Sequence, residues 1–222
     1  MYALFARYYD NVDPGRFARD LAEKDWVILL RNEAQRIVGF STLQTYPHAG
    51  VLGRTMILYS GDTIMDRAYR HRGALAGAFG HFLLRTIEAC RELPFYWFLT
   101  SKGARTYRFL PVFFRAFAPA FNRPTPPAMK RLVDEVAAAK FGARYAPETQ
   151  IVVCDGERDR LCEAEQDPLL LQRDDPHIRF FLERNPGHAR GDELVCMAEI
   201  SAANLNARAR RVIAHTEVHW RE

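Results

Sequence analysis

The sequence predicts a protein of the mixed α/β class, with a sheet of several strands flanked by helices. Three observations lead to this class: apolar runs of strand length, longer segments whose apolar residues recur at helical spacing, and polar, glycine or proline breaks between them. The clearest strands are residues 26–30 and 95–99, and the clearest helix is residues 74–91. With 222 residues the chain can bury one sizeable core, so we expect a single domain over residues 1–222.

The first third of the chain is expected to form a helix followed by an antiparallel hairpin. Polar residues 32–35 separate two apolar segments, which is typical of a hairpin turn. Residues 46–50 contain proline and glycine and are predicted to end the second strand. Ser60, Gly61 and Asp62 interrupt the next apolar segment, and the sequence leaves open whether they form a turn or a β-bulge. The expected elements are a helix at residues 17–24 and strands at residues 26–30, 36–45, 54–59 and 61–65.

The rest of the chain is predicted to alternate helices with strands. Residues 119–127 contain four prolines, so we expect a rigid loop there. Residues 155–192 are rich in charged and turn-forming residues and are predicted to be an insertion or lid before the last strand. The expected elements are helices at residues 74–91, 104–117 and 128–140, and strands at residues 95–99, 150–154 and 193–200.

Composition and charge limit the classes of function. The chain is 48% hydrophobic and 26% charged, as in an ordinary globular protein, and its net charge of +4 suits an anionic small ligand. Its 31 basic residues are interleaved with 27 acidic ones, so we expect no nucleic-acid partner. No apolar run has the length of a membrane span, no signal peptide is apparent, and the four cysteines lack C-x-x-C spacing. We therefore expect a cytoplasmic protein with reduced thiols and no membrane partner.

Residues 65–75 carry the most specific pattern in the chain, a basic turn between a strand and a long helix. Gly73 lies where this helix begins. The first amides of a helix have no intrahelical acceptor and lie at the positive end of the helix dipole, so they attract a phosphate. We expect the backbone N–H groups of residues 72–75 to hold a diphosphate, with Arg70 and Arg72 adding positive charge. The alternative is an ordinary basic helix start that binds no ligand.

This turn resembles the acyl-CoA pyrophosphate loop of the GNAT superfamily of N-acyltransferases, whose pattern is Arg/Gln-x-x-Gly-x-Gly/Ala. Arg70 and Gly73 match its first two fixed positions, whereas Leu75 stands at the small third position and His71 where the family often has glycine. The resemblance covers about residues 17–154. It implies a mostly antiparallel, splayed sheet flanked by helices, and an acyl-CoA donor with an acetyl or longer acyl group. The implied cofactor-binding residues are Ile64, Met65, Arg70, His71, Arg72, Gly73, Ala74 and Leu75.

The same resemblance implies a reaction and two catalytic residues. In GNAT enzymes an amine attacks the thioester directly, with a base for the amine and an acid for the leaving thiolate. Tyr107 falls near the place from which the family often draws its acid, and Asp62, on the strand leading into the turn, is the candidate base. Tyr107 could instead pack in the core, and Asp62 could be a turn aspartate. The expected acceptor is a small-molecule amine.

Two other functions remain open at this point. The donor could be the thioester of an acyl-carrier protein, whose pantetheine arm would lie between the splayed strands without the nucleotide. The chain could also be a binding module that keeps the fold and lacks catalysis. His215 and His219 are four residues apart, but no glutamate stands at the metalloprotease position and no third ligand is evident, so we predict no metal site. A strongly apolar strand edge could pair two copies into a homodimer.

Overall fold

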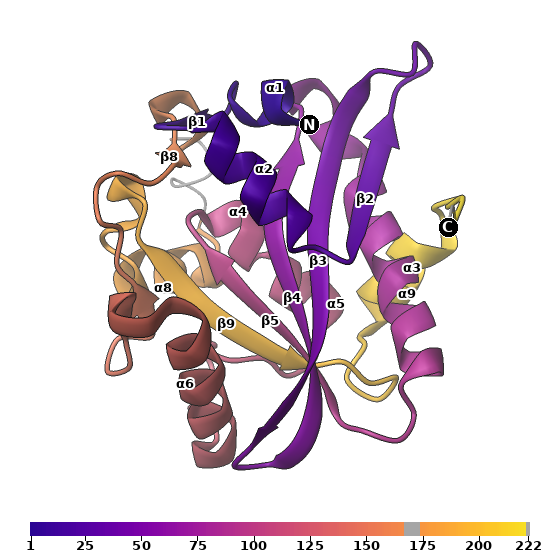
Figure 1. Ribbon diagram of the computed structural model, residues 1–222. Coiled ribbons are helices and arrows are strands. Elements are labelled where there is room, and N and C mark those ends of the chain that lie inside the picture. Colours follow the sequence, from indigo (N-terminus) through magenta and orange to yellow (C-terminus); the bar gives the residue numbers. More distant parts are fainter. Residues whose placement is uncertain (167–173, 221–222) are drawn as a thin grey trace.

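The computed structural model describes residues 1–166 and 174–220 and, in these residues, has a seven-stranded sheet at its centre (Figure 1). Neighbouring strands of this sheet are antiparallel except for β4 and β5, which are parallel. The predicted class, a mixed α/β fold with a mostly antiparallel sheet, is confirmed. In spatial order the strands are β2 (Trp26–Arg31), β3 (Ile37–Gly50), β4 (Gly53–Met65), β5 (Phe95–Ser101), β9 (Glu193–Glu199), β7 (Ile151–Val152) and β6 (Tyr145–Ala146).

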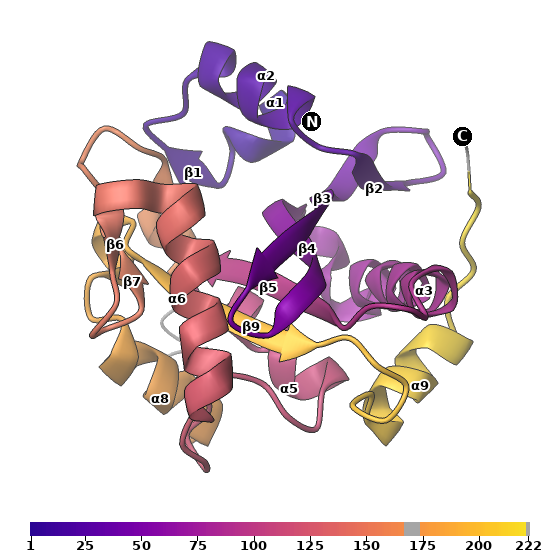
Figure 2. The same ribbon diagram turned by 60° about the horizontal axis from the view of Figure 1, so that its bottom comes forward.

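Helices cover both faces of the sheet. Leu58, Trp97 and Leu99 pack against the helices of one face, and Ile57 and Phe98 pack against α6 on the other. Figure 2 shows α6 and the pair α3 and α9 on opposite sides of β5 and β9. Alternate residues of β5 therefore face opposite layers, as expected of a central strand. The first face carries α3 (Ala74–Ala89), α4 (Ala104–Tyr107), α5 (Phe109–Phe113), α8 (Pro176–Arg184) and α9 (Ala207–Ala214), and the other carries α6 (Pro127–Phe141).

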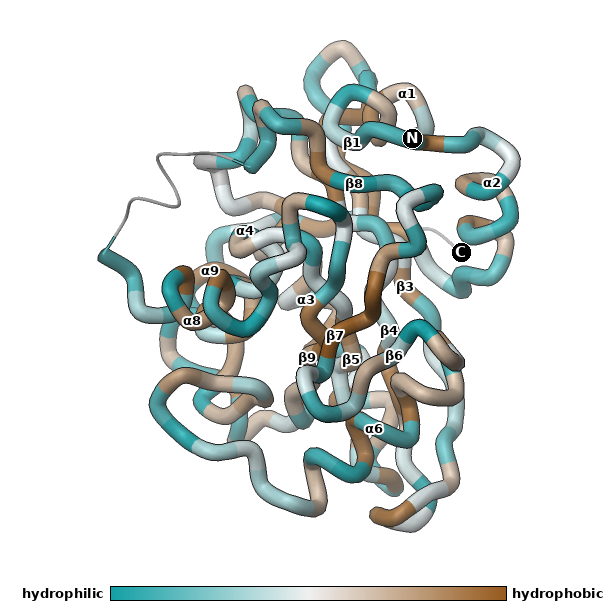
Figure 3. Tube along the Cα trace, turned by 90° about the vertical axis from the view of Figure 1, so that its left-hand side faces the viewer, coloured by the Kyte–Doolittle hydropathy of each residue, from teal (hydrophilic) through white to brown (hydrophobic). Residues whose placement is uncertain are grey.

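The N-terminal segment packs over the ends of β3 and β4. Helices α1 (Tyr2–Phe5) and α2 (Pro14–Ala22) place Phe5 and Phe17 against Phe40 of β3 and Ile64 of β4. Between these helices, β1 (Tyr9–Asp10) pairs with β8 (Arg160–Leu161) in a separate two-stranded sheet, and the two strands lie side by side in Figure 3. The N-terminal segment is thereby joined to the segment that the sequence predicts as an insertion.

Strands β3 and β4 form a longer hairpin than the sequence predicted. β3 does not end at residues 46–50 but continues through Pro47, which pairs with Met56. Because β2 pairs with β3 only as far as Leu43, no strand among the described residues covers the outer edge of β3 beyond that point, and a missing proline N–H is tolerated there. The predicted break was therefore wrong. Gly53, at φ 76°, supplies the left-handed backbone at the turn into β4.

Residues 60–62 form a β-bulge, so the two strands predicted on either side of them are the single strand β4. On β3 the pairing advances from Ser41 to Leu43, while on β4 it moves from Thr63 back to Ser60, which leaves one extra residue in β4. A bulge of this kind bends its strand and increases the local twist. It lies at the point where β4 leaves β5.

The predicted splay of the sheet is confirmed at β4 and β5. Their parallel pairing ends at Ser60 and Leu99, although β4 continues to Met65 and β5 to Ser101. In the described part of the chain, residues 63–65 of β4 pair with β3 on one edge, and residues 61–65 pair with no strand on the other. The backbone of this edge therefore faces a gap between two strands.

The helix predicted at residues 104–117 is divided into α4 and α5. Pro111 has no backbone N–H, and its ring clashes with a helical carbonyl four residues earlier, which belongs to Tyr107. Tyr107 is the last residue of α4, so the helix ends where this clash predicts. The division turns the chain back toward the first face of the sheet, where Phe114 bridges to Leu205.

The expected homodimer edge and the expected insertion or lid at residues 155–192 are not tested by the structure and remain predictions. Strand β2 lies at the edge of the sheet and exposes Trp26, Val27 and Leu29, which is the apolar edge considered for a homodimer. Residues 155–192 include β8 and α8, and their role as an insertion or lid is untested. Within the described ranges, no helix combines the length and apolar character that a membrane crossing requires.

Candidate active site

Helix α3 begins without a side-chain cap. Gly73, its N-cap residue, has left-handed backbone at φ 66°, and its carbonyl accepts the first helical hydrogen bond from Gly77 at 3.0 Å. In the described structure, the backbone N–H groups of Ala74, Leu75 and Ala76 donate to no acceptor. Such amides remain available to an anion. The turn before them is a 3₁₀ helix, Arg67–Arg72.

A cavity of about 360 Å³ lies beside these amides. Its wall is formed by residues 63–65 of β4, residues 73–76 at the start of α3, most of residues 103–109, and Tyr8 and Tyr9. Of the residues predicted to bind a cofactor, Ile64, Met65, Arg70, Gly73, Ala74 and Leu75 line this one cavity. The side chains of His71 and Arg72 lie outside the described part of the structure. The fold therefore brings the splayed end of β4 and the uncapped end of α3 to the same space.

Arg70 lies at the α3 end of this cavity and is paired with a carboxylate. Its Nε donates to the carbonyl oxygen of Met65 at 2.9 Å, its guanidinium lies 5.0 Å from the centre of the Tyr8 ring, and its Nη2 lies 2.5 Å from Oε2 of Glu165. Its Nη1 is buried and has no hydrogen-bond partner among the described residues. Glu165 is far from Arg70 in sequence, so no spacing could have indicated this pair.

Arginines give the rest of the cavity wall its positive charge. Arg105, Arg108 and Arg208 line the cavity, and Glu165 is the only carboxylate among its described lining residues. Arg108 is held by Asp175 at 3.1 Å. The excess of cations over carboxylates suits an anionic ligand.

Asp62 lies at the bulge, next to Thr63 of the cavity wall but outside the cavity lining, and beside a partly buried group of charged side chains. Lys102, just beyond β5, bonds Asp159 at 2.5 Å and lies 3.8 Å from Glu193, and the Thr100 hydroxyl donates to Glu193. Burial and, to a lesser extent, the negative charge of Asp159 raise the pKa of Asp62, Lys102 opposes the rise, and the resulting pKa is about 7. Sequence reasoning found Asp62 and missed the other members, because they come from segments that only the fold brings together.

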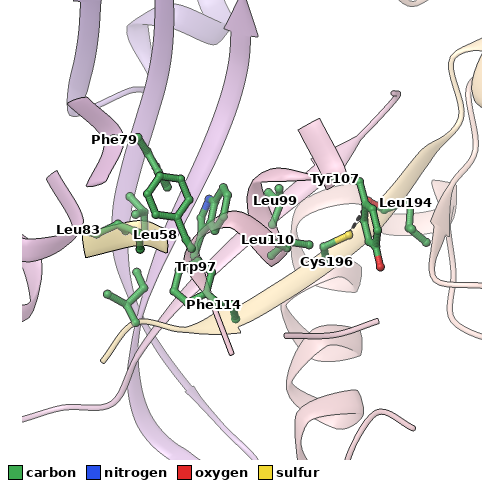
Figure 4. Close-up of a cluster of buried hydrophobic side chains, with 14 of the residues drawn as sticks. Leu58, Phe79, Leu83, Trp97, Leu99, Tyr107, Leu110, Phe114, Leu194 and Cys196 are labelled. Atoms are coloured by element: carbon green, nitrogen blue, oxygen red, sulfur yellow. Dashed lines mark hydrogen bonds between the residues drawn. The ribbon is translucent and has the colours of Figure 1, made fainter. Parts of the chain in front are cut away.

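Tyr107 does not reach the cavity. Its side chain is fully buried, and its hydroxyl donates to the carbonyl oxygen of Pro119 at 2.9 Å. Figure 4 shows it in the core near Leu99 and Cys196. This placement argues against Tyr107 as the acid for a thiolate and favours the core-packing alternative. Tyr9 does line the cavity, and burial raises the pKa of its phenol, so that it stays protonated at neutral pH.

In residues 1–166 and 174–220, no group of three or more histidine, cysteine, aspartate or glutamate side chains is arranged to hold a metal ion.

No protein-family model matches the chain, and no curated protein matches it. One solved structure that resembles it is a GNAT family N-acetyltransferase (YhbS) from Escherichia coli in complex with CoA. The match has 15% sequence identity and a TM-score of 0.37, and it covers 48% of this chain and 58% of that one.

Proposed function

We propose that this protein is an N-acyltransferase that moves an acyl group from acyl-CoA to an amine. The observation that carries the proposal is the cavity in which the uncapped amides of α3 meet the open edge of β4. A phosphate group and an extended, amide-containing arm are the two ligand parts that such a cavity suits. CoA contains both, and the basic turn with Arg70 and Gly73 resembles the loop that binds it in GNAT enzymes.

The residues proposed to bind CoA are those whose hydrogen-bond donors have no acceptor among the described residues. The N–H groups of residues 74–76 and Nη1 of Arg70 would bind phosphate oxygens, since these groups have no acceptor among the described residues. The open backbone edge of residues 61–65 would pair with the amides of the pantetheine arm, as a strand pairs with a neighbour. The thioester supplies an activated acyl group at the split between β4 and β5.

Asp62 would serve as the base. An amine must lose a proton to form an amide, and a base acts best when its pKa lies near the working pH. Burial raises the pKa of Asp62 to about 7, which meets this condition. Tyr9 replaces Tyr107 in the proposal as the acid for the leaving thiolate, because its side chain lines the cavity. The acceptor is a small-molecule amine.

Thermal unfolding of the purified protein with increasing CoA and acetyl-CoA tests this function. A ligand that binds only the folded state raises the unfolding midpoint, by an amount equivalent to about 2.7 kcal/mol at a hundredfold excess over its Kd. We expect both compounds to raise the midpoint, and thiol release from acetyl-CoA to depend on an added amine. Unchanged midpoints at millimolar CoA and acetyl-CoA would contradict the proposal.

A further inference from the structure

Glu165 is a buried carboxylate at the phosphate end of the cavity. Only 4% of its side chain is exposed, and its two oxygens bind different arginines: Oε1 lies 2.7 Å from Nη2 of Arg67, and Oε2 lies 2.5 Å from Nη2 of Arg70. The short 3₁₀ helix Glu163–Glu165 carries it against the turn that opens α3. One of the arginines that would attract a phosphate is therefore already paired.

This pairing changes the charge that a ligand meets. The two arginines and one carboxylate sum to +1 instead of +2, and the carboxylate lines the same cavity as the α3 amides. The interaction between charges grows with their product and is stronger where water is excluded. Glu165 therefore opposes a phosphate group with two negative charges about twice as strongly as a group with one.

We infer that Glu165 is a specificity-determining residue of the donor site. Its negative charge reduces the preference of the site for a doubly charged diphosphate over a singly charged phosphodiester. The inference rests on the proposed function, since it concerns the donor of that reaction. Nη1 of Arg70 still offers one unpartnered donor, which is enough for a single phosphate oxygen. With a net charge of +1 the group still favours a diphosphate, but by about half as much as two unpaired arginines would, so the site accepts a pantetheine thioester on a singly charged phosphodiester more readily than it would without Glu165.

Calorimetric titration of the full chain with three ligands of increasing charge tests the inference. The ligands are pantetheine, the methyl diester of 4′-phosphopantetheine, and 3′-dephospho-CoA, which carry zero, one and two negative charges at the phosphate position. In Glu165→Gln, which keeps an oxygen for one arginine, we expect affinity to rise about tenfold for dephospho-CoA, about threefold for the diester, and not at all for pantetheine.

A matched control is Glu163→Gln, which removes the same charge from an exposed position on the same 3₁₀ helix. We expect it to leave the affinities for all three ligands unchanged. The gain is compared between ligands in one protein sample, so a lower folded fraction in the Glu165→Gln sample does not change the result. A gain that is equal for the three ligands, or a loss that grows with ligand charge, would overturn the inference while leaving the proposed function intact. Absence of binding by dephospho-CoA to both wild type and variant would overturn the proposed function and this inference together.

Discussion

The two ends of the candidate site are built from different parts of the chain. The end at α3, where we propose that the phosphates bind, is called the phosphate end and consists mainly of backbone. It comprises a left-handed glycine and the free amides that follow it, all within a few residues of sequence. The other end, where β4 separates from β5, adjoins a group of charged side chains outside the cavity lining, and we call it the split-strand end. In this group Asp62, Lys102, Asp159 and Glu193 meet from four distant segments. The first end should be sensitive to changes of backbone conformation, and the second to changes of charge.

The largest effect is expected for Asp62→Asn, which removes the proposed base. Because positioned bases contribute roughly 10²- to 10⁴-fold, we expect kcat to fall by about that factor while the Kd for CoA stays unchanged. In the wild type, activity should rise with pH through about 7 as Asp62 loses its proton, and this rise should be absent in the variant. Steady-state kinetics between pH 5 and 9 check both points; a variant that keeps wild-type kcat would exclude Asp62 as the base.

The same substitution should make the protein more stable at high pH. The pKa of Asp62 rises from 3.8 to about 7 on folding, so over this window the folded state holds a proton that the unfolded state releases. Folding stability from this group therefore falls as pH rises from 3.8 to 7. Urea denaturation should show Asp62→Asn gaining stability over wild type at pH 8 and little at pH 3.5. An equal gain at both pH values would contradict the raised pKa.

Lys102→Met should be the most destabilising change at the split-strand end. It would leave Asp159 and Glu193 without their cation. Breaking a fully buried ion pair from one side costs about 3 kcal/mol, and for this partly exposed group we expect a smaller loss of about 1–2 kcal/mol. Since Lys102 opposes the rise in the Asp62 pKa, its loss should also move the pH–activity rise upward. Lys102→Arg, which keeps the charge, serves as the control. If the urea midpoint of Lys102→Met equals that of the wild type, the ion pairs of Lys102 with Asp159 and Glu193 do not stabilise the fold.

Alanine substitutions at two glycines distinguish the effect of backbone strain from an effect on ligand binding. Gly73 and Gly53 both have left-handed backbone, at φ 66° and 76°, and an added Cβ at either would meet no atom within 4 Å. Replacing each by alanine should cost about 1 kcal/mol through strain alone. Only Gly73→Ala should also weaken CoA binding, because Gly53 lies in the β3–β4 turn. Denaturation and calorimetry of the pair measure this, and equal CoA affinities in the two variants would speak against the phosphate site.

The smallest effect is expected for Tyr107→Phe. It removes one buried hydrogen bond, to the carbonyl of Pro119, and should cost about 1 kcal/mol of folding stability. Activity should stay at the wild-type level, because the phenol is fully buried in the core and its hydroxyl donates to the Pro119 carbonyl. Tyr9→Phe is the contrasting variant, for which turnover should fall. A kcat loss in Tyr107→Phe that exceeds the loss in Tyr9→Phe would restore Tyr107 as the acid.

The same contrast explains how much the sequence could predict. The turn at Gly73 was found because its signals are local: a strand, basic residues, a glycine and a long helix within one short stretch. The pairing of Arg70 with Glu165 could not be found, because it depends on how distant segments pack. The end of β3 was misplaced because the tolerance of Pro47 depends on where β2 stops pairing.

The division of the helix predicted at residues 104–117 can, by contrast, be predicted from the sequence. Pro111 is incompatible with an uninterrupted helix through the four residues before it, and the structure breaks the helix there. The same rule places Tyr107 at a helix end instead of inside a long helix. Its burial, however, follows from the packing of α8 and the loop at Pro119, which no local signal indicates.

Backbone amide resonances during a CoA titration test the central claim most directly. If the start of α3 binds the phosphates, the amide signals of Ala74, Leu75 and Ala76 should shift strongly and saturate with the calorimetric Kd, while the amide of Gly53 stays in place. CoA binding that saturates without moving these three signals would contradict the account.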